Sequence, residues 1–276
     1  MPLTLLNCTH RPHAYAAALT LVLALTACAT TPPQPPTAIR LQALGQPDLL
    51  LLGEQHDAPE HQQIHAEVVQ TLAQQGRLAA LALEMADTGT STAGLPRDAS
   101  EDAVQKVLQW NDKGWPWKHY GPAVMAAVQA GVPVLGANLP RARMRDAMAD
   151  TTLDARLPPP ALLAQQEAIR TGHCKLLPET QTLPMTRIQV AKDVSMARTM
   201  EQAAQPGKVV VLMAGSGHVD RSLGVPQHLP ATLSHKAVGL RAGGARPGDS
   251  TALFDSIWAT KPIEPKDYCA GVAPKK

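Results

Sequence analysis

The residues with the clearest capacity for chemistry stand directly after apolar runs of the sequence. One run ends in Gly53-Glu54-Gln55-His56 and a later one in Gly215-Ser216-Gly217-His218, so the spacing Gly-x-x-His occurs twice. Carboxylate and imidazole groups can transfer protons or bind a metal ion, and glycines permit tight turns and close approach of the backbone. The candidates that follow such runs are Glu54, His56, Glu84, Asn138, His218 and Arg221.

The apolar runs have the length of β-strands and alternate with longer segments of helical periodicity. We expect strands at residues 48–52, 78–83, 132–137, 208–214 and, more weakly, 236–240. We expect helices at residues 59–75, 122–131 and 185–205. This alternation predicts an α/β fold with a mostly parallel central sheet flanked by helices. Residues 154–184, which include three consecutive prolines, are expected to form a small helical insertion.

A parallel sheet would bring the candidate residues together. The carboxyl ends of parallel strands meet at one edge, and ligands of open α/β sheets bind in the crevice outside that edge. The sequence therefore predicts a polar crevice at the strand ends. The alternative is that each of these residues caps a helix or stabilises a turn and has no further role.

The N-terminal segment has the features of an export signal. A weakly basic stretch precedes an apolar run over residues 14–27, which is shorter than the roughly 20 residues of a membrane-spanning helix. The run ends in Leu25-Thr26-Ala27-Cys28, which resembles the lipobox of bacterial lipoproteins. We therefore expect a signal peptide at 1–27, a lipidated Cys28 with a Pro-rich tether at 28–40, and a single domain at 41–276. The resemblance implies a lipid anchor in the outer membrane, facing the periplasm; the alternative is an ordinary signal peptide that happens to contain a cysteine.

Composition narrows the function classes further. The formal net charge is only +2, which argues against a nucleic-acid partner because such proteins carry a clustered basic face. After loss of the signal peptide and lipidation of Cys28, the remaining cysteines are Cys174 and Cys269. In an oxidising compartment two such thiols are expected to form a disulfide.

Four segments together resemble the ChaN-like haem-binding lipoproteins, which belong to a superfamily with the Tiki proteases and the erythromycin-esterase-like proteins. They are the turn at 53–57, Leu83-Glu84-Met85, the segment at 137–141 and the turn at 215–218. The resemblance extends from about Pro47 to Leu240. It implies an α/β fold, haem binding in iron acquisition and a haem pocket between two subunits. The implied partners are haem, a second copy of the chain and an outer-membrane haem receptor.

The expected haem ligand is Tyr120. Ferric iron is commonly held by a phenolate or an imidazole, and Tyr120 ends a segment, 110–120, that contains three of the four tryptophans. Flat apolar rings beside basic groups would suit a porphyrin and its propionates. The expected pocket residues are Trp115, Trp117, Lys118, His119 and His61. Because the resemblance implies a pocket between two subunits, Lys118, His119 or His61 could come from the opposite subunit. The alternative is that the tryptophans pack in the core and Tyr120 lies in a turn. Tyr268, beside Cys269, is expected at the surface.

A second function remains open on the sequence alone. The turns that bear His56 and His218 match those that carry metal or catalytic groups in the hydrolytic relatives. In a periplasmic metal-dependent hydrolase, Glu54 or Glu84 would be the general base and Arg221 would stabilise an anion. His61 and His65 would share one helical face and could also ligate a metal ion, although a solvated helix face is the simpler interpretation.

Overall fold

The structure is a computed structural model that describes residues 35–246 and 248–272. The expected signal peptide, Cys28 and the first part of the tether lie outside these residues. Within the described ranges, no helix combines the length and apolar character needed to cross a membrane.

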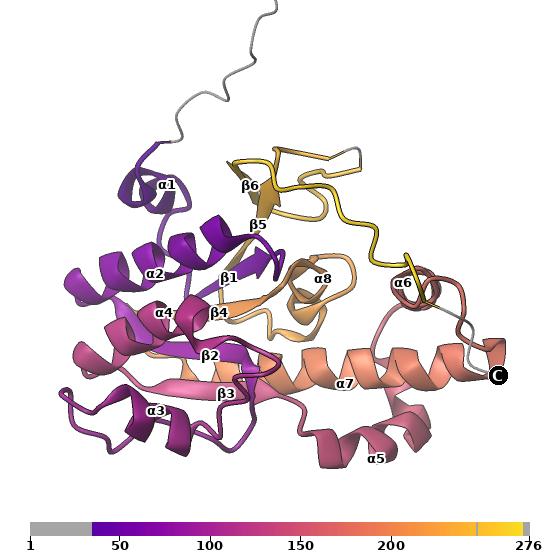
Figure 1. Ribbon diagram of the computed structural model, residues 1–276, viewed down its shortest axis with the longest axis horizontal. Coiled ribbons are helices and arrows are strands. Elements are labelled where there is room, and N and C mark those ends of the chain that lie inside the picture. The colour runs from indigo at the N-terminus through magenta and orange to yellow at the C-terminus, as the bar shows by residue number, and fades with distance from the viewer. Residues whose placement is uncertain (1–34, 247, 273–276) are drawn as a thin grey trace, which may run out of the picture. The chain divides into compact units, whose positions relative to one another are not determined.

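Six parallel strands form one sheet, as the alternating pattern predicts (Figure 1). Their order across the sheet is β3-β2-β4-β1-β5-β6. The bounds are β1 Leu49–Glu54, β2 Leu78–Asp87, β3 Val134–Asn138, β4 Val209–Gly215, β5 His235–Ala242 and β6 Ser256–Thr260. β1 and β4 are buried along their whole length and β2 up to its last residue, which explains their nearly continuous apolar sequences.

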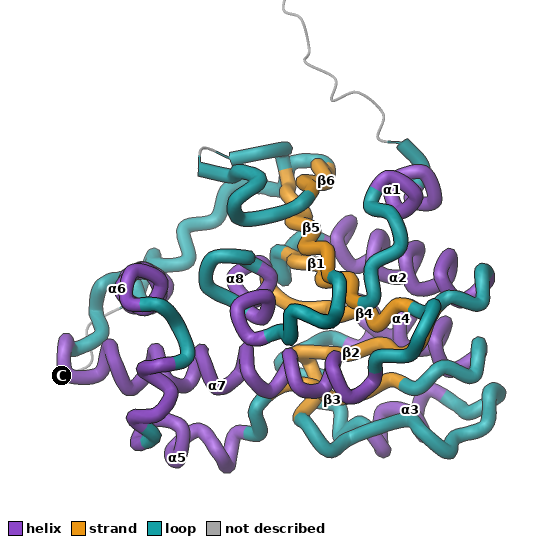
Figure 2. Tube along the Cα trace, turned by 180° about the vertical axis from the view of Figure 1, so that it is seen from behind, coloured by secondary structure: helices purple, strands orange, loops and turns teal. Residues whose placement is uncertain are grey.

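Helices cover both faces of the sheet (Figures 1 and 2). Alternate residues of β1 divide between two cores: Leu50 and Leu52 belong to the core shared with α2 and α4, and Leu49 and Leu51 to the core shared with α7. This division follows from the two-residue period of a strand. The helices are α1 Thr37–Ala43, α2 Pro59–Gln74, α3 Glu101–Val107, α4 Trp117–Gln129, α5 Met144–Ala149, α6 Pro159–Gly172, α7 Glu179–Ala203 and α8 Ser216–Val219.

Two helices begin earlier than the sequence pattern predicts. Pro122 is the expected first residue of one helix and Pro184 the residue just before the other, because proline is best tolerated at a helix start, but Pro122 lies inside α4 and Pro184 inside α7. In α4 the additional residues include Trp117 and Tyr120, whose side chains are buried in the core. Burial of these two aromatic side chains explains why the helix extends back past the proline.

The expected helical insertion is present and packs on α7. Its helix α6, together with α5 before the insertion and with α7, encloses a small apolar cluster that includes Leu153, Leu157 and Ile188. Arg187 of α7 donates two hydrogen bonds to the Asp154 carboxylate, at 2.7 and 2.8 Å. Just after α6, Cys174 forms a disulfide with Cys269 near the C-terminus. The insertion is therefore covalently joined to the end of the chain.

Candidate functional site

Adjacent strands β1 and β4 bring the two Gly-x-x-His turns together. Their register pairs Glu54 with Gly215, so the residues that follow both strands share one edge of the sheet. A pocket of about 420 Å³ opens there. Of the six residues predicted at the strand ends, Glu54, His56, Glu84 and His218 line it.

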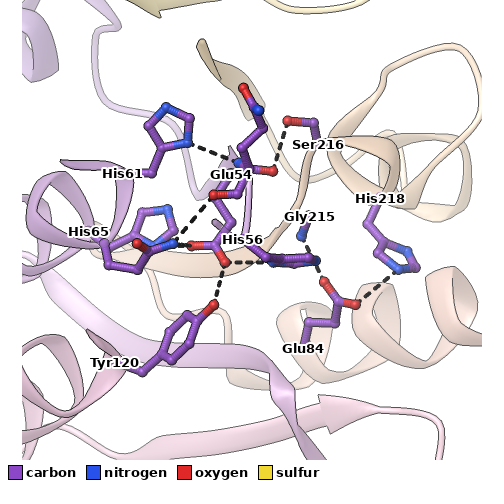
Figure 3. A network of polar contacts seen from close by, with 11 residues as sticks. Glu54, His56, His61, His65, Glu84, Tyr120, Gly215, Ser216 and His218 are labelled. Carbon is purple, nitrogen blue, oxygen red and sulfur yellow. Dashed lines mark hydrogen bonds and ion pairs between the residues drawn. The ribbon is translucent and has the colours of Figure 1, made fainter. Parts of the chain in front are cut away.

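Glu54 is the centre of a buried hydrogen-bond network (Figure 3). Its carboxylate accepts hydrogen bonds from the hydroxyl of Tyr120 at 2.7 Å and the amide of Gln62 at 3.0 Å, and it lies 2.7 Å from Nδ1 of His56. Burial alone would raise the pKa of Glu54, but the bond to His56 and the nearby His65 lower it. The group is therefore held as a carboxylate.

His56 presents one side of its ring to the pocket. Nδ1 faces Glu54, and the ring stacks edge-on against Trp115 with centroids 4.8 Å apart. Nε2 lies beside Gly215, where an added Cβ would come within 3.0 Å of it (Figure 3). Burial would lower the pKa of His56, but the Glu54 carboxylate outweighs it and raises the pKa. A ring oriented through one nitrogen can donate, accept or coordinate through the other.

His218 lies between two buried carboxylates. Its Nδ1 is 2.5 Å from the Asp193 carboxylate and its Nε2 is 3.3 Å from Glu84. The second oxygen of Glu84 accepts the Gly215 N–H at 2.7 Å. Although burial opposes a charged ring, Glu84 and Asp193 raise the pKa of His218 to about 10. His218 is therefore an imidazolium at neutral pH, and both of its nitrogens are occupied.

The comparisons with known proteins fit this geometry. The family model described as haem-binding uptake, Tiki superfamily, ChaN matches residues 40–229. The chain belongs to the ChaN family. A solved structure titled "Cofacial heme binding to ChaN of Campylobacter jejuni" is 24% identical, with a TM-score of 0.62, over 80% of this chain and 90% of that one. The type III effector HopBA1 is 15% identical, with a TM-score of 0.45, over 83% and 94% of the two chains. No curated protein matches.

The expected ligand of this ChaN-family protein, Tyr120, is not at the pocket surface. Its side chain is only 2% exposed, and its hydroxyl donates to Glu54 behind the pocket. Burial and the Glu54 charge raise the pKa of Tyr120, which opposes the phenolate form. In this arrangement the ring is a buried support of Glu54, and iron binding by Tyr120 stays a prediction.

The other residues expected around Tyr120 form the wall behind His56. Trp117 is buried, and its indole N–H donates to Glu101 at 2.7 Å. Trp115 reaches the site only through its contact with His56. Lys118 is exposed and His119 half-buried, and neither lines the pocket. The aromatic rings of this segment pack against one another, as the core-packing alternative predicts, and a porphyrin slot between two subunits stays a prediction.

His61 and His65 are buried rather than solvated, and they do not form a metal pair. His61 accepts the Gln55 N–H through Nδ1 at 2.9 Å, and its Nε2 lies 3.0 Å from the Thr260 hydroxyl. Burial lowers the pKa of His61 to about 4. Among the described residues, no group of three or more His, Cys, Asp or Glu side chains is arranged to hold a metal ion.

Two predicted crevice residues lie beside the pocket. Asn138 donates its side-chain amide to the Glu84 carbonyl at 2.8 Å, so it supports the strand end from behind. Arg221 points away, donating to the Thr251 carbonyl at 2.9 Å. Arg221 was expected in the crevice because it follows His218 closely, but the short helix α8 turns the chain before it.

Asp193, Arg246 and Tyr268 belong to the site or its supports but were not predicted as site residues. Asp193 lies in the middle of α7, and only its position within a buried helical stripe could have indicated a partner for a histidine. Arg246 and Tyr268 line the pocket from the C-terminal part of the chain, far in sequence from the strand ends. Their contribution depends on the path of the last loops, which no local pattern specifies.

The pocket groups fit the cofactor that the family implies. Haem needs an oxygen or nitrogen donor for its iron and cationic groups for its propionates. The pocket offers an oriented imidazole in His56, an exposed phenol in Tyr268 and a guanidinium in Arg246. These three residues would hold haem, whose iron supplies the coordination chemistry.

Proposed function

We propose that this ChaN-family protein is a lipid-anchored haem-binding protein of iron acquisition that acts in the periplasm. The observation that carries the proposal is the strand-end pocket, where an imidazole, a phenol and a guanidinium converge within the matched family domain. A binding role is favoured over catalysis because His218 and Glu84 are engaged in a fixed ion-pair network. An outer-membrane haem receptor is the proposed source of the ligand.

A pocket-blocking substitution tests the site. Gly217 lines the pocket, and an added Cβ there meets no atom within 4 Å, so Gly217→Glu is expected to fold normally. The new side chain adds bulk and a negative charge that opposes the propionates. We expect hemin to bind at least about tenfold more weakly, since charge-assisted contacts contribute roughly 1.5–3 kcal/mol each.

The matched control is Gln70→Glu, which adds the same charge at an exposed position of α2 outside the pocket. Its affinity for hemin, measured by absorbance titration, should equal that of the wild type. Equal affinities in all three proteins would contradict the placement of haem in this pocket.

We further propose that the protein acts as a homodimer. The pocket is open to solvent on one side, and a flat apolar ligand bound there would leave one face uncovered. Cofacial haem binding is described for the related ChaN of Campylobacter jejuni. In a dimer, the uncovered face of each haem would stack on that of the other, so both faces would be removed from water.

The lipid anchor is proposed from the Leu-Thr-Ala-Cys sequence. Cys28→Ser removes the acylated thiol, and the acyl chains contribute about 0.8 kcal/mol per buried CH₂ to membrane affinity. The variant should therefore be recovered in the soluble fraction of broken cells, whereas the wild type sediments with membranes. Equal membrane recovery of both proteins would refute lipidation at Cys28.

A further inference from the structure

A second hollow, here called the α7 groove, lies between α7 and the chain that follows β3. It is lined by Thr88 and by residues within 139–156 and 191–202, and its volume is about 600 Å³. Its walls are α5, which packs on α7 (Figure 1), the 3-10 helix η2 Thr151–Ala155 and one side of α7. Among the described residues, none lines both the groove and the strand-end pocket. The groove is therefore a separate candidate site, with the size of a small-molecule pocket.

Two arginines of the groove have no partner in the protein. Arg156 and Arg198 line the groove and also an adjoining hollow of about 440 Å³, so both residues lie where the two hollows meet. Both are exposed. Within the described part of the chain, neither guanidinium forms an ion pair or a hydrogen bond, whereas Arg187 and Arg241 are each paired with a carboxylate. Two positive charges thus face the same space without a counter-charge between them.

The acidic residues of these hollows do not neutralise that pair. Asp146 lies 3.2 Å from the guanidinium of Arg143, which is its ion-pair partner. Asp150 accepts hydrogen bonds from the backbone N–H of Thr152 at 3.0 Å and from its hydroxyl at 2.6 Å. Glu201 lines the adjoining hollow but is in no ion pair of the described residues. The two arginines are therefore available to an anion from outside the protein.

The remaining wall of the groove is apolar and held in place. Leu139, Leu153 and Val194 line it. The hydroxyl of Ser195 donates to the carbonyl of Ala137 at 2.9 Å, which fixes α7 to the end of β3. A fixed apolar wall beside two cations suits an organic anion better than a metal ion or an uncharged sugar.

We propose that the α7 groove binds a phosphate monoester, with Arg156 and Arg198 at the phosphate and the apolar wall against the organic group. A guanidinium binds phosphate oxygens through paired, charge-assisted hydrogen bonds. A phosphate monoester carries close to two negative charges at neutral pH, which matches two arginines. The same headgroup occurs in soluble esters and in phosphatidic acid, so each source needs its own probe.

Calorimetric titration of the processed protein with phenyl phosphate tests the site. The wild type should bind the probe saturably. The double variant Arg156→Gln/Arg198→Gln should bind it at least about tenfold more weakly, since both charge-assisted contacts are lost. Arg145→Gln, at an exposed position of α5 that lines neither hollow, should match the wild type. A wild type without saturable binding, or equal Kd values in the three proteins, would overturn the proposal.

The source of the headgroup is tested with vesicles of phosphatidylcholine that contain phosphatidic acid. The Cys28→Ser protein is used, because it should not sediment through its own lipid anchor. Sedimentation that is lost when Arg156 and Arg198 are also replaced by glutamine would assign the groove to a lipid headgroup. Sedimentation that these substitutions leave unchanged would assign it to a soluble ester.

His228 shows where the probe binds. It lines the adjoining hollow, and burial together with the charge of Arg156 lowers the pKa of His228 to about 4. Its neutral ring is thus sensitive to a change of charge at Arg156. Phenyl phosphate should shift the ring signals of His228 in NMR spectra and leave those of His173, which lines neither hollow, in place. Signals of His228 that do not move at saturation would place the probe elsewhere and contradict the proposal.

Hemin titration separates this site from the proposed haem pocket. The Arg156→Gln/Arg198→Gln protein should bind hemin as the wild type does. A parallel loss of hemin and phenyl phosphate affinity would show that the groove is not a separate site and would overturn the proposal. A wild type that binds phenyl phosphate but not hemin would instead overturn the proposed function and leave the groove assignment intact.

Discussion

Replacing His218 with glutamine is expected to lower the free energy of unfolding by about 3–5 kcal/mol at pH 7, measured by urea denaturation. The substitution removes the positive charge between Glu84 and Asp193, both of which are buried. Two buried carboxylates without a cation must either repel each other or take up protons. The loss in free energy of unfolding should be smaller near pH 5, because protonation of the Glu84 or Asp193 carboxyl then relieves their repulsion.

Two further variants distinguish loss of the ion pair from the loss of stability that any histidine substitution could cause. Adding Asp193→Asn to His218→Gln removes one of the unpaired charges and should recover part of the lost stability. His173→Gln, at the half-exposed end of α6, should cost less than about 1 kcal/mol. A His218→Gln protein as stable as the His173→Gln protein would show that the network is not an ion pair.

The same network sets a pH dependence for the wild type. The pKa of His218 is raised to about 10, so its contribution to stability is complete below the ordinary value of 6.5 and is lost as the pH rises towards 10. The pKa of Glu84 is lowered to about 2, despite burial, chiefly by His218, so its contribution is lost as the pH falls from 4.5 towards 2. Both ionic contributions are therefore present together between about pH 4.5 and 6.5.

Gly136→Ala should destabilise the protein by about 3 kcal/mol or more. A Cβ at this position of β3 would lie 2.0 Å from the backbone oxygen of Asp87 and 2.3 Å from the Thr90 hydroxyl. The closer atom belongs to the backbone, so a rotamer change cannot relieve the clash. Displacement of the strand end would also move Asn138, whose side-chain amide donates a hydrogen bond to the Glu84 carbonyl.

Gly172→Ala is the matched control, because an added Cβ there meets no atom within 4 Å. Its unfolding midpoint in urea should stay equal to that of the wild type or rise slightly, since alanine favours helix. Similar midpoints for Gly136→Ala and Gly172→Ala would contradict the close packing of β3 on the turn after β2.

The sequence predicted the elements that are long and strongly patterned. The five expected strands correspond to β1–β5 within a few residues, because continuous apolar runs and βαβ spacing reflect burial between two helical layers. Strand β6 was missed: it has only five residues, follows a loop and pairs at the edge of the sheet. Its one buried aromatic, Trp258, gives no periodic pattern by itself.

The site was predictable where it depends on the strand ends. Glu54, His56, Glu84 and His218 converge because parallel strands end at one edge, which residue order alone implies. The burial of Tyr120 could not be predicted, because a segment rich in tryptophan can form either a surface slot or a packed wall, and only tertiary contacts decide between them. The position of Tyr268 depends on the path of the C-terminal segment 261–272, and that of Asp193 on the rotation of α7; no local pattern specifies either.

The central claim is that the strand-end pocket binds haem, and a hemin titration of the processed wild-type protein tests it most directly. Absorbance in the Soret region should shift and saturate at a fixed ratio of haem to protein. The Gly217→Glu protein, measured in parallel, should require at least about ten times more hemin for the same shift. A linear response that never saturates, or the same curve for both proteins, would contradict the account.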